Sequence, residues 1–371
     1  MSIITGLGLD RDNADVVLLP LRERRAGAAR LRSQRLPIAT GANDAFFMAH
    51  PDWIERFTDT VIAKGLEDAG HHVDFLAGAL ETGEPAAFVG YVGWLVDVLG
   101  ARGIDTGAVA ESVGLVGREA LAVVNGDTRE ALSRIIDAGI ARALAAPMSQ
   151  EICIPGESSL DAAADTFLHA LLLGERRAAL GIAREALRTA KHPTDVYVDV
   201  FQRALEEIGR RWQMNRITVA QEHTATAIVQ FVLAQLYSSL ERSGANRGTA
   251  LVTGVEGELH QVGANLVADA LEMDGWNVRF LGTNMPHDGI LEAADEMKVQ
   301  LVAVSAMMLF NVEPVGRLVE SVRALPRGGA TPRILVGGGA FRGLPKLWRD
   351  VGADASAFDV RGACAAARGS T

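Results

Sequence analysis

Residues 249–263 read TALVTGVEGELHQVG, a short apolar stretch that runs into a loop with a histidine. Thr249–Val255 has the length and the apolar content of a buried strand. Three similar stretches follow at Asn277–Leu281, Leu301–Met307 and Arg333–Val336, and helical patterns near 262–274, 287–297 and 312–325 separate them. This alternation predicts a Rossmann-like, doubly wound α/β domain with a parallel sheet over residues 247–371. Residues 363–371 have no evident pattern.

His260 follows the first predicted strand, at the edge where doubly wound folds bind their ligands. Imidazole is a suitable ligand for a transition metal such as cobalt. Glu258 stands two residues earlier, and a carboxylate that accepts a hydrogen bond from the far ring nitrogen fixes the tautomer of a metal-binding histidine. Gly263 lets the next helix begin close to a ligand. Taken alone, the hexapeptide Glu258–Gly263 is more typical of an ordinary loop histidine than of a metal ligand.

Two further motifs lie at the ends of later strands. Ser305-Ala306-Met307 ends the third strand, and Gly337-Gly338-Gly339 ends the fourth. The three motifs together resemble the cobalamin-binding domain of methionine synthase, corrinoid methyltransferase subunits and mutases, which usually have D-x-H-x-x-G, then S-x-L or S-x-x, then G-G. The resemblance implies that His260 replaces the cofactor's own base on cobalt. It also implies that Ser305 lines a slot for the displaced nucleotide tail, and that Gly337 and Gly338 let this tail pass close to the backbone. A plain strand-to-helix turn is the alternative for the glycines.

Residues 150–246 are predicted to form a four-helix bundle. Gln150–Ser158 contains Pro155 and Gly156 and is typical of a linker. The helix boundaries are predicted from local residues: Ser158 or Ser159 as the first cap, Pro193 at the start of the third helix, Asn215 at its end, and Thr218 with Gln221 as a capping box that opens the fourth.

Trp212 is predicted near the end of the third helix, and Glu222-His223 in the first turn of the fourth. Because the connection is short, both should face the same edge of the bundle. The spacing W-(nine residues)-E-H resembles light-sensing cobalamin photoreceptors of the CarH and LitR type. In that family the motif marks the pocket of the 5′-deoxyadenosyl group, which implies that Trp212 contacts this group and that Glu222 and His223 flank it. The alternative is a core tryptophan beside a solvated first turn.

Two features depart from those photoreceptors. They carry a histidine directly after the tryptophan, where this chain has Gln213. A light product with a second histidine from that position is therefore excluded. They also carry an N-terminal helix-turn-helix module, for which this sequence shows no pattern. The output of such a sensor is not predicted by the resemblance.

Residues 1–149 are predicted to be an all-helical domain. Apolar residues recur at spacings of three and four between Phe88 and Leu99, and Asp105 or Thr106 and then Asp127 are candidate caps. The segment 88–104, FVGYVGWLVDVLGARGI, resembles the globin-like module of photocobilins, which pair cobalamin with a bilin. The resemblance implies biliverdin as a second chromophore. The residues it suggests are Tyr91 and Trp94 as walls, Arg102 for the propionates, and His71 or His72 for a ring carbonyl. The alternative places Tyr91 in the packed core.

Composition narrows the functional classes. The net charge is −10, which argues against a nucleic-acid partner. The basic stretch Arg22–Arg35 is predicted to be one solvated helix face. The longest apolar run is too short to span a bilayer. The chain has only two cysteines, Cys153 and Cys364, which argues against a disulfide framework, and a cytoplasmic protein is expected.

The sequence therefore favours a cytoplasmic light sensor that holds adenosylcobalamin between the bundle and the α/β domain and has no enzymatic activity. Light would break the cobalt–carbon bond and change a homo-oligomer or an attached effector. The alternative is a corrinoid methyl carrier of a methyltransferase system. Trp212, Glu222 and His223 argue against this alternative, because a methyl group needs an accessible upper face. The sequence shows no eight-fold βα barrel pattern, which argues against a full adenosylcobalamin mutase.

Overall fold

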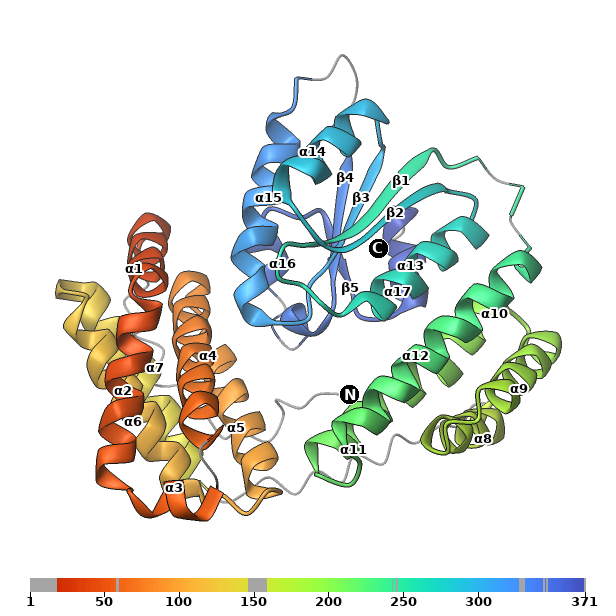
Figure 1. Cartoon of the computed structure of the whole chain (residues 1–371). Coiled ribbons are helices and arrows are strands. Elements are labelled where there is room, and N and C mark those ends of the chain that lie inside the picture. The colour runs from red at the N-terminus through yellow and green to blue at the C-terminus, as the bar shows by residue number, and fades with distance from the viewer. Residues whose placement is uncertain are drawn as a thin grey trace. The chain divides into compact units, whose positions relative to one another are not determined.

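The chain forms two compact units, Met1–Gln150 and Glu151–Thr371. The computed structural model describes residues 19–57, 60–145, 159–241, 243–244, 246–326, 331–342, 344 and 346–369 (Figure 1). The predicted linker Gln150–Ser158 and Cys153 lie outside the described residues. Each unit is described by itself below.

The described part of the first unit is helical, as predicted. Its helices are α1 (Leu21–Ser33), α2 (Arg35–Ala49), α3 (Asp52–Phe57), α4 (Thr60–Thr82), α5 (Pro85–Gly100), α6 (Thr106–Ala122) and α7 (Gly126–Leu144). The long helix α4 contacts each of the other six helices, and its buried residues include Val73, Leu76 and Leu80. The apolar positions of α5 pack inward, as their spacing predicted.

Local details of the first unit differ in two places from the sequence predictions. Asp105 caps α6 by accepting a hydrogen bond from the backbone of Ala108, but Asp127 is not a cap. The helix α7 begins at Gly126, whose φ of 56° turns the chain into the helix early, and Asn125 is the cap residue. The basic stretch is not one solvated face, because it spans α1 and α2 and two of its arginines pair with α4. These ion pairs are Arg32–Glu81 and Arg35–Asp74.

The second unit opens with the predicted four-helix bundle. Its helices are α8 (Asp161–Leu172), α9 (Arg176–Thr189), a continuous third helix and α12 (Val219–Leu236), followed by a short turn, η3 (Tyr237–Ser239). The third helix consists of α10 (Pro193–Val196), a π-helical segment η2 (Tyr197–Gln202) and α11 (Arg203–Gln213). The capping box of Thr218 and Gln221 is confirmed. The cap residue of α8 is Leu160 rather than Ser159, and Ser158 lies outside the described residues.

The rest of the second unit is a five-stranded parallel sheet in the order β2-β1-β3-β4-β5. The strands are β1 (Thr249–Val255), β2 (Asn277–Met285), β3 (Leu301–Ser305), β4 (Arg333–Gly337) and β5 (Ala355–Ala357). The helices between and after them are α13 (Gln261–Met273), α14 (His287–Glu296), η4 (Leu309–Asn311), α15 (Val312–Ala324), η5 (Gly339–Phe341), α16 (Leu347–Asp350) and α17 (Val360–Ala367). The predicted α/β architecture is confirmed. The prediction that the chain end lacks structure was wrong, because residues 360–367 form α17.

Helices cover both faces of this sheet (Figure 1). The helix α13 lies with α17 on one face, and α14 lies with α15 on the other. The bundle packs on the side of α13 and α17, to which α12 and η2 respectively make contact. This arrangement leaves the carboxyl ends of β1, β3 and β4 at one edge of the sheet.

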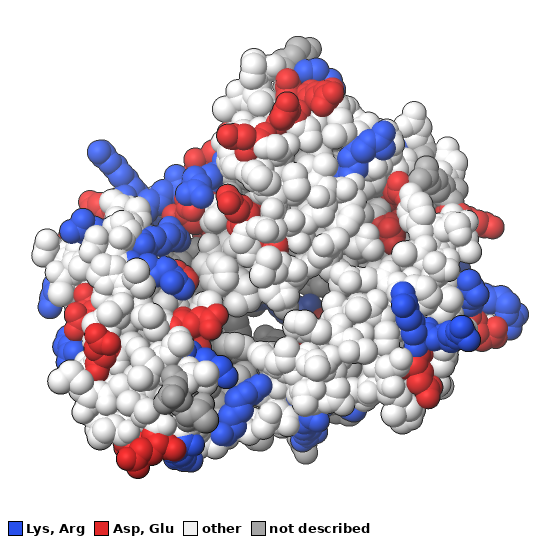
Figure 2. Space-filling model, viewed as in Figure 1, with Lys and Arg blue, Asp and Glu red and all other residues white. Residues whose placement is uncertain are grey.

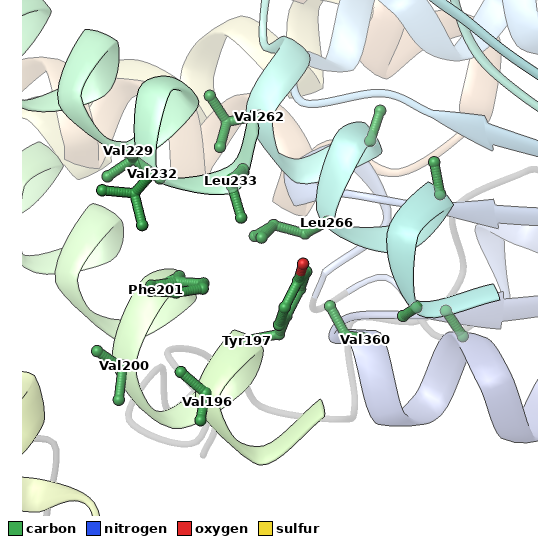
Figure 3. Packing of buried hydrophobic residues seen from close by; sticks show 14 of the residues in the cluster. Val196, Tyr197, Val200, Phe201, Val229, Val232, Leu233, Val262, Leu266 and Val360 are labelled. Carbon is green, nitrogen blue, oxygen red and sulfur yellow. The ribbon is translucent and has the colours of Figure 1, made fainter. Parts of the chain in front are cut away.

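Bundle and sheet share one hydrophobic core. Figure 3 shows Tyr197 reaching from the bundle toward α13, with Leu266 and Val360 beside its ring. The hydroxyl of this tyrosine donates a hydrogen bond of 3.0 Å to Asp269 on α13. On the surface, Arg361 of α17 pairs with Asp195 and with an aspartate in the π-helical segment. The packing of α12, η2, α13 and α17 therefore makes one folding unit of these two parts.

No described helix is both long enough and apolar enough to cross a bilayer. Figure 2 shows acidic and basic side chains interspersed over the face in view.

Candidate cofactor site

His260 lies at the edge of the sheet, between the end of β1 and the first residue of α13. Its side chain is 54% exposed, whereas that of Glu258 is fully buried. One carboxylate oxygen of Glu258, Oε1, lies 2.6 Å from His260 Nδ1 and also accepts a hydrogen bond of 2.8 Å from the His260 backbone. Nδ1 of the imidazole is therefore held by the protein, and Nε2 is the ring nitrogen left for a metal.

The second oxygen of Glu258 is held by two donors that the sequence analysis did not identify. Oε2 accepts hydrogen bonds from the backbone N–H of Met307 at 2.5 Å and from the side-chain amide of Asn311 at 2.9 Å. Asn311 is 2% exposed and ends η4, directly before α15. The fully satisfied carboxylate cannot rotate without losing several bonds, so it fixes the orientation of the imidazole.

The charge of Glu258 determines the tautomer of His260. Burial by itself raises the pKa of Glu258, but the hydrogen bonds from His260 and from the Met307 backbone outweigh burial and leave that pKa below its usual value. The carboxylate is therefore ionised at neutral pH and accepts hydrogen bonds only. Nδ1 of His260 must carry the proton, and the lone pair of Nε2 is available as a ligand.

The residues around His260 suit a large, partly apolar cofactor. Leu259 and Met307 are 74% and 47% exposed, which is unusual for such apolar side chains. A Cβ added to Gly263 would meet no atom within 4 Å, so the first turn of α13 is open to a close approach. Among the described residues, no three His, Cys, Asp or Glu side chains are placed to hold a metal ion together. One imidazole is sufficient for a corrin, whose macrocycle itself supplies the equatorial ligands.

The other predicted residues of this domain lie at the ends of β3 and β4. Ser305 is the last residue of β3 and is half-buried. Gly337 and Gly338 follow at the end of β4, where added Cβ atoms would lie 2.6 Å from the Ala357 carbonyl and 2.3 Å from the Ala306 carbonyl. Gly338 also has a φ of 99°. These glycines are thus required by the close approach of the protein's own backbone, whatever ligand passes them.

The bundle motif occupies the predicted edge. Trp212 is the last residue but one of α11 and packs, partly buried, against the core of the unit. Glu222 lies in the first turn of α12, and its carboxylate interacts with His223 Nδ1 at 2.5 Å and accepts from Thr226 at 3.0 Å. The His223 side chain is 74% exposed. Glu222 shares a helix face with Ala225 and Val229, which are buried in the core of the unit.

The structure brings together some of the residues predicted for a bilin in the first unit. His72 and Tyr91 are buried, with 2.7 Å between His72 Nδ1 and the tyrosine hydroxyl, and the Tyr91 ring stacks on Phe75 at 3.8 Å. Trp94 lies 6.1 Å from the Tyr91 ring. Burial, aided by neighbouring His71, lowers the pKa of His72 to about 3, so its imidazole is neutral.

Arg102 serves a local structural role in the described residues. It donates a hydrogen bond of 2.7 Å to the Val98 carbonyl and so stabilises the end of α5. Tyr91 packs in the core, which was the alternative interpretation of its position in the sequence. The biliverdin site stays a prediction.

Known proteins support the assignment of the cofactor. Residues 248–368 match the family model of a B12 binding domain, and residues 163–237 match a second model that is also described as a B12 binding domain. The two matches cover the α/β domain and the bundle, respectively. The chain thus carries the structural elements of a cobalamin-binding protein and binds a corrinoid cofactor.

The individual relatives are corrinoid proteins. Trimethylamine corrinoid protein 1 of Methanosarcina mazei is 26% identical over 186 residues, which cover 48% of this chain and 84% of that protein. The trimethylamine corrinoid protein of Methanosarcina barkeri is 26% identical over 130 residues, 34% of this chain and 60% of that protein. The structure of the monomethylamine corrinoid protein of Methanosarcina barkeri aligns with a TM-score of 0.51 at 20% identity, covering 57% of this chain and all of that one. This last similarity supports the fold alone.

Proposed function

We propose that the protein is a corrinoid carrier, which holds cobalamin through His260 and presents the upper face of the cobalt to a partner protein for methyl transfer. The observation that carries the proposal is the buried, fully hydrogen-bonded Glu258 beside an exposed imidazole. The similarity to trimethylamine corrinoid proteins supports the methyl group as the cargo. In this role the chain is a carrier and not an enzyme by itself.

When bound, cobalamin supplies a cobalt centre that can accept and release a one-carbon group. The residues of the chain contribute orientation and charge. Nε2 of His260 would donate its lone pair to the cobalt, and Glu258 holds the proton on Nδ1. Asn311 and the Met307 backbone hold the carboxylate, and through it the imidazole, in a fixed orientation.

A second candidate is the adenosylcobalamin light sensor, and one observation favours it. Trp212 lies near the end of α11, and Glu222 and His223 lie near the start of the next helix, α12. The resemblance to cobalamin photoreceptors implies an adenosyl pocket at these three residues. A sensor would use this edge to hold an upper alkyl group and to move after photolysis. Biliverdin in the first unit belongs to this candidate.

One titration separates the two candidates. The purified protein is loaded in the dark with methylcobalamin or with adenosylcobalamin, and each affinity is measured by absorbance for the wild type and for Trp212→Ala. A carrier should bind both cofactors within a few-fold of each other, and the variant should leave this ratio unchanged. An adenosyl preference of more than about tenfold that Trp212→Ala removes would overturn the carrier in favour of the sensor.

The same samples are then illuminated with green light and analysed by size-exclusion chromatography. The carrier should keep its oligomeric state with either cofactor. A light-dependent change of oligomer with adenosylcobalamin alone would again identify a sensor, and a long-wavelength band after addition of biliverdin would add the second chromophore.

A further inference from the structure

A cavity of about 340 Å³ lies on the second unit between α12, α13 and the beginning of β2. Its walls include Leu233 of α12 and Val278 and Phe280 of β2, and its polar wall includes Asp269 and Glu272 of α13. Asp269 is nine residues after His260, which corresponds to about 13 Å along the helix axis. Ser305 and Gly337 lie on β3 and β4, with β1 between them and β2. The cavity is therefore separate from the residues assigned to cobalamin.

The charge of the cavity wall has one sign. Asp269 and Glu272 are its charged residues, and none of its described lining residues is Lys, Arg or His. The Glu272 carboxylate accepts a hydrogen bond of 2.6 Å from Tyr237 at the mouth of the cavity. A site of this kind attracts cations and disfavours anions.

One carboxylate oxygen of Asp269 has a hydrogen-bond donor and the other has none in the described structure. Asp269 is 5% exposed, and its Oδ2 accepts a hydrogen bond from Tyr197. Its Oδ1 has no hydrogen-bond partner among the residues that the structure describes. Asp269 lines the cavity, so this carboxylate oxygen can pair there with an external positive group.

We propose that this cavity binds a small organic ammonium ion, with the nitrogen against Oδ1 of Asp269 and the alkyl part against Leu233, Val278 and Phe280. Alkyl walls and an aromatic ring fit an organic cation better than a bare metal ion, for which the described residues offer no cluster of three ligands. The volume is sufficient for a ligand of a few carbon atoms. The proposal does not rest on the function proposed above.

The position of the cavity gives this ligand a role. Its walls come from the bundle and from the α/β domain, and it adjoins the hydrogen bond between Tyr197 and Asp269 that joins them. Figure 3 shows the neighbouring packing of Leu233 against Leu266 and Tyr197. An ammonium ion bound there would neutralise the buried carboxylate and stabilise the packing of α12 on α13.

The test is calorimetric titration of the cobalamin-loaded full chain with n-butylammonium chloride at pH 7.5. The compounds 1-butanol and sodium butyrate serve as neutral and anionic analogues of similar length, and magnesium chloride serves as the inorganic cation. Binding is expected for n-butylammonium alone. Equal binding of 1-butanol, or binding of magnesium without n-butylammonium, would overturn the proposal.

Three variants locate the site. Asp269→Asn removes the charge while keeping an acceptor for Tyr197, and it should weaken n-butylammonium about tenfold or more. Ala234→Phe fills the cavity from α12, keeps the carboxylate, and should weaken binding comparably. Glu292→Gln on α14, an exposed carboxylate remote from the cavity, is the matched control and should bind like the wild type. The cobalamin spectrum reports the fold of each variant. Unchanged affinity in both cavity variants would exclude this site.

Discussion

At the scale of single residues, the cofactor site is a chain of three side chains. Asn311 holds Glu258, and Glu258 holds His260. Each bond removes a rotational freedom of the next group, so the imidazole is oriented before a metal arrives. The exposed end of this chain is the ligand, and its buried end is an amide that never contacts the cofactor's cobalt.

The series of hydrogen bonds from Asn311 through Glu258 to His260 predicts that substitutions along it lower the cobalamin affinity by different amounts. His260→Ala removes the lower ligand and should lower the affinity about a hundredfold or more. Glu258→Gln and Asn311→Leu should each cost about ten- to a hundredfold, because outer partners of metal ligands have effects of that size. The measurement is an absorbance titration with hydroxocobalamin. Glu256→Gln, an exposed neighbour in the same loop, should bind normally. Wild-type affinity in Asn311→Leu would show that Glu258 is held well enough by the backbone alone.

Two glycines near the site predict opposite results. Gly338→Ala should destabilise the second unit by about 3 kcal/mol or more, since its φ of 99° and the Ala306 carbonyl at 2.3 Å leave no room for a Cβ. Gly263→Ala should leave the stability unchanged or slightly higher, because open space surrounds that Cβ in the first turn of α13.

Urea unfolding followed by circular dichroism measures both effects. If the cofactor approaches the first turn of α13, Gly263→Ala should also weaken cobalamin without affecting the fold. A Gly338→Ala protein as stable as the wild type would contradict the close approach of β4 to the segment after β3.

At the scale of secondary structure, the strands could be predicted wherever the apolar runs were long. The runs that became β1 and β3 are almost continuously apolar and lie between clear helical patterns, so period and length identified them. The capping box of Thr218 and the turn at Pro193 are determined by residues next to one another. Such local chemistry is visible in a sequence.

Other elements depend on contacts that a sequence does not reveal. The strand β5 has three residues, and α17 is rich in alanine, so neither has a clear period. Asn311 is 53 residues from Glu258 and approaches it only because β3 lies beside β1. The pairing of Glu258 with His260 could be predicted because they are only two positions apart in the sequence, whereas the donors at Oε2 could not.

The contact between Tyr197 of the π-helical segment and Asp269 of α13 predicts that the stability of the second unit depends on pH. Burial, opposed by the Tyr197 hydrogen bond and aided by Glu272, raises the pKa of Asp269 from 3.8 to about 6. A carboxyl group with a raised pKa contributes its full stabilisation when the pH is below its pKa in the unfolded chain. This stabilisation is lost as the pH rises through its pKa in the folded protein. The loss falls between about pH 4 and 6 and amounts to about 3 kcal/mol.

Asp269→Asn removes this titration and keeps the acceptor, so in the absence of a bound cation the variant should be about 2 kcal/mol more stable than the wild type at pH 7.5. The difference between the two proteins should shrink as the pH falls to 4. Tyr197→Phe is the contrasting variant, because it leaves the carboxylate without a donor and should lower the stability at pH 7.5. Denaturant unfolding at several pH values measures all three, and a difference independent of pH would contradict the raised pKa.

At the scale of the whole molecule, the division into two units predicts where cofactor binding resides. The residues assigned to cobalamin, from Trp212 to Gly338, all lie in the unit Glu151–Thr371. That unit has its own core. Expressed alone, it should bind hydroxocobalamin within about threefold of the full chain. A loss of more than tenfold would show that the first unit contributes to the site.

The core shared by the bundle and the sheet also limits where genetic recombination can join parts of two related proteins. An exchange of genetic material near residue 150 passes between the two units and transfers the second one with every partner intact. An exchange between α12 and β1 would combine Tyr197 from one ancestor with Asp269 from another. It would also combine Arg361 with aspartates that come from the other ancestor. The bundle and the α/β domain should therefore be inherited together, although each matches a family model of its own.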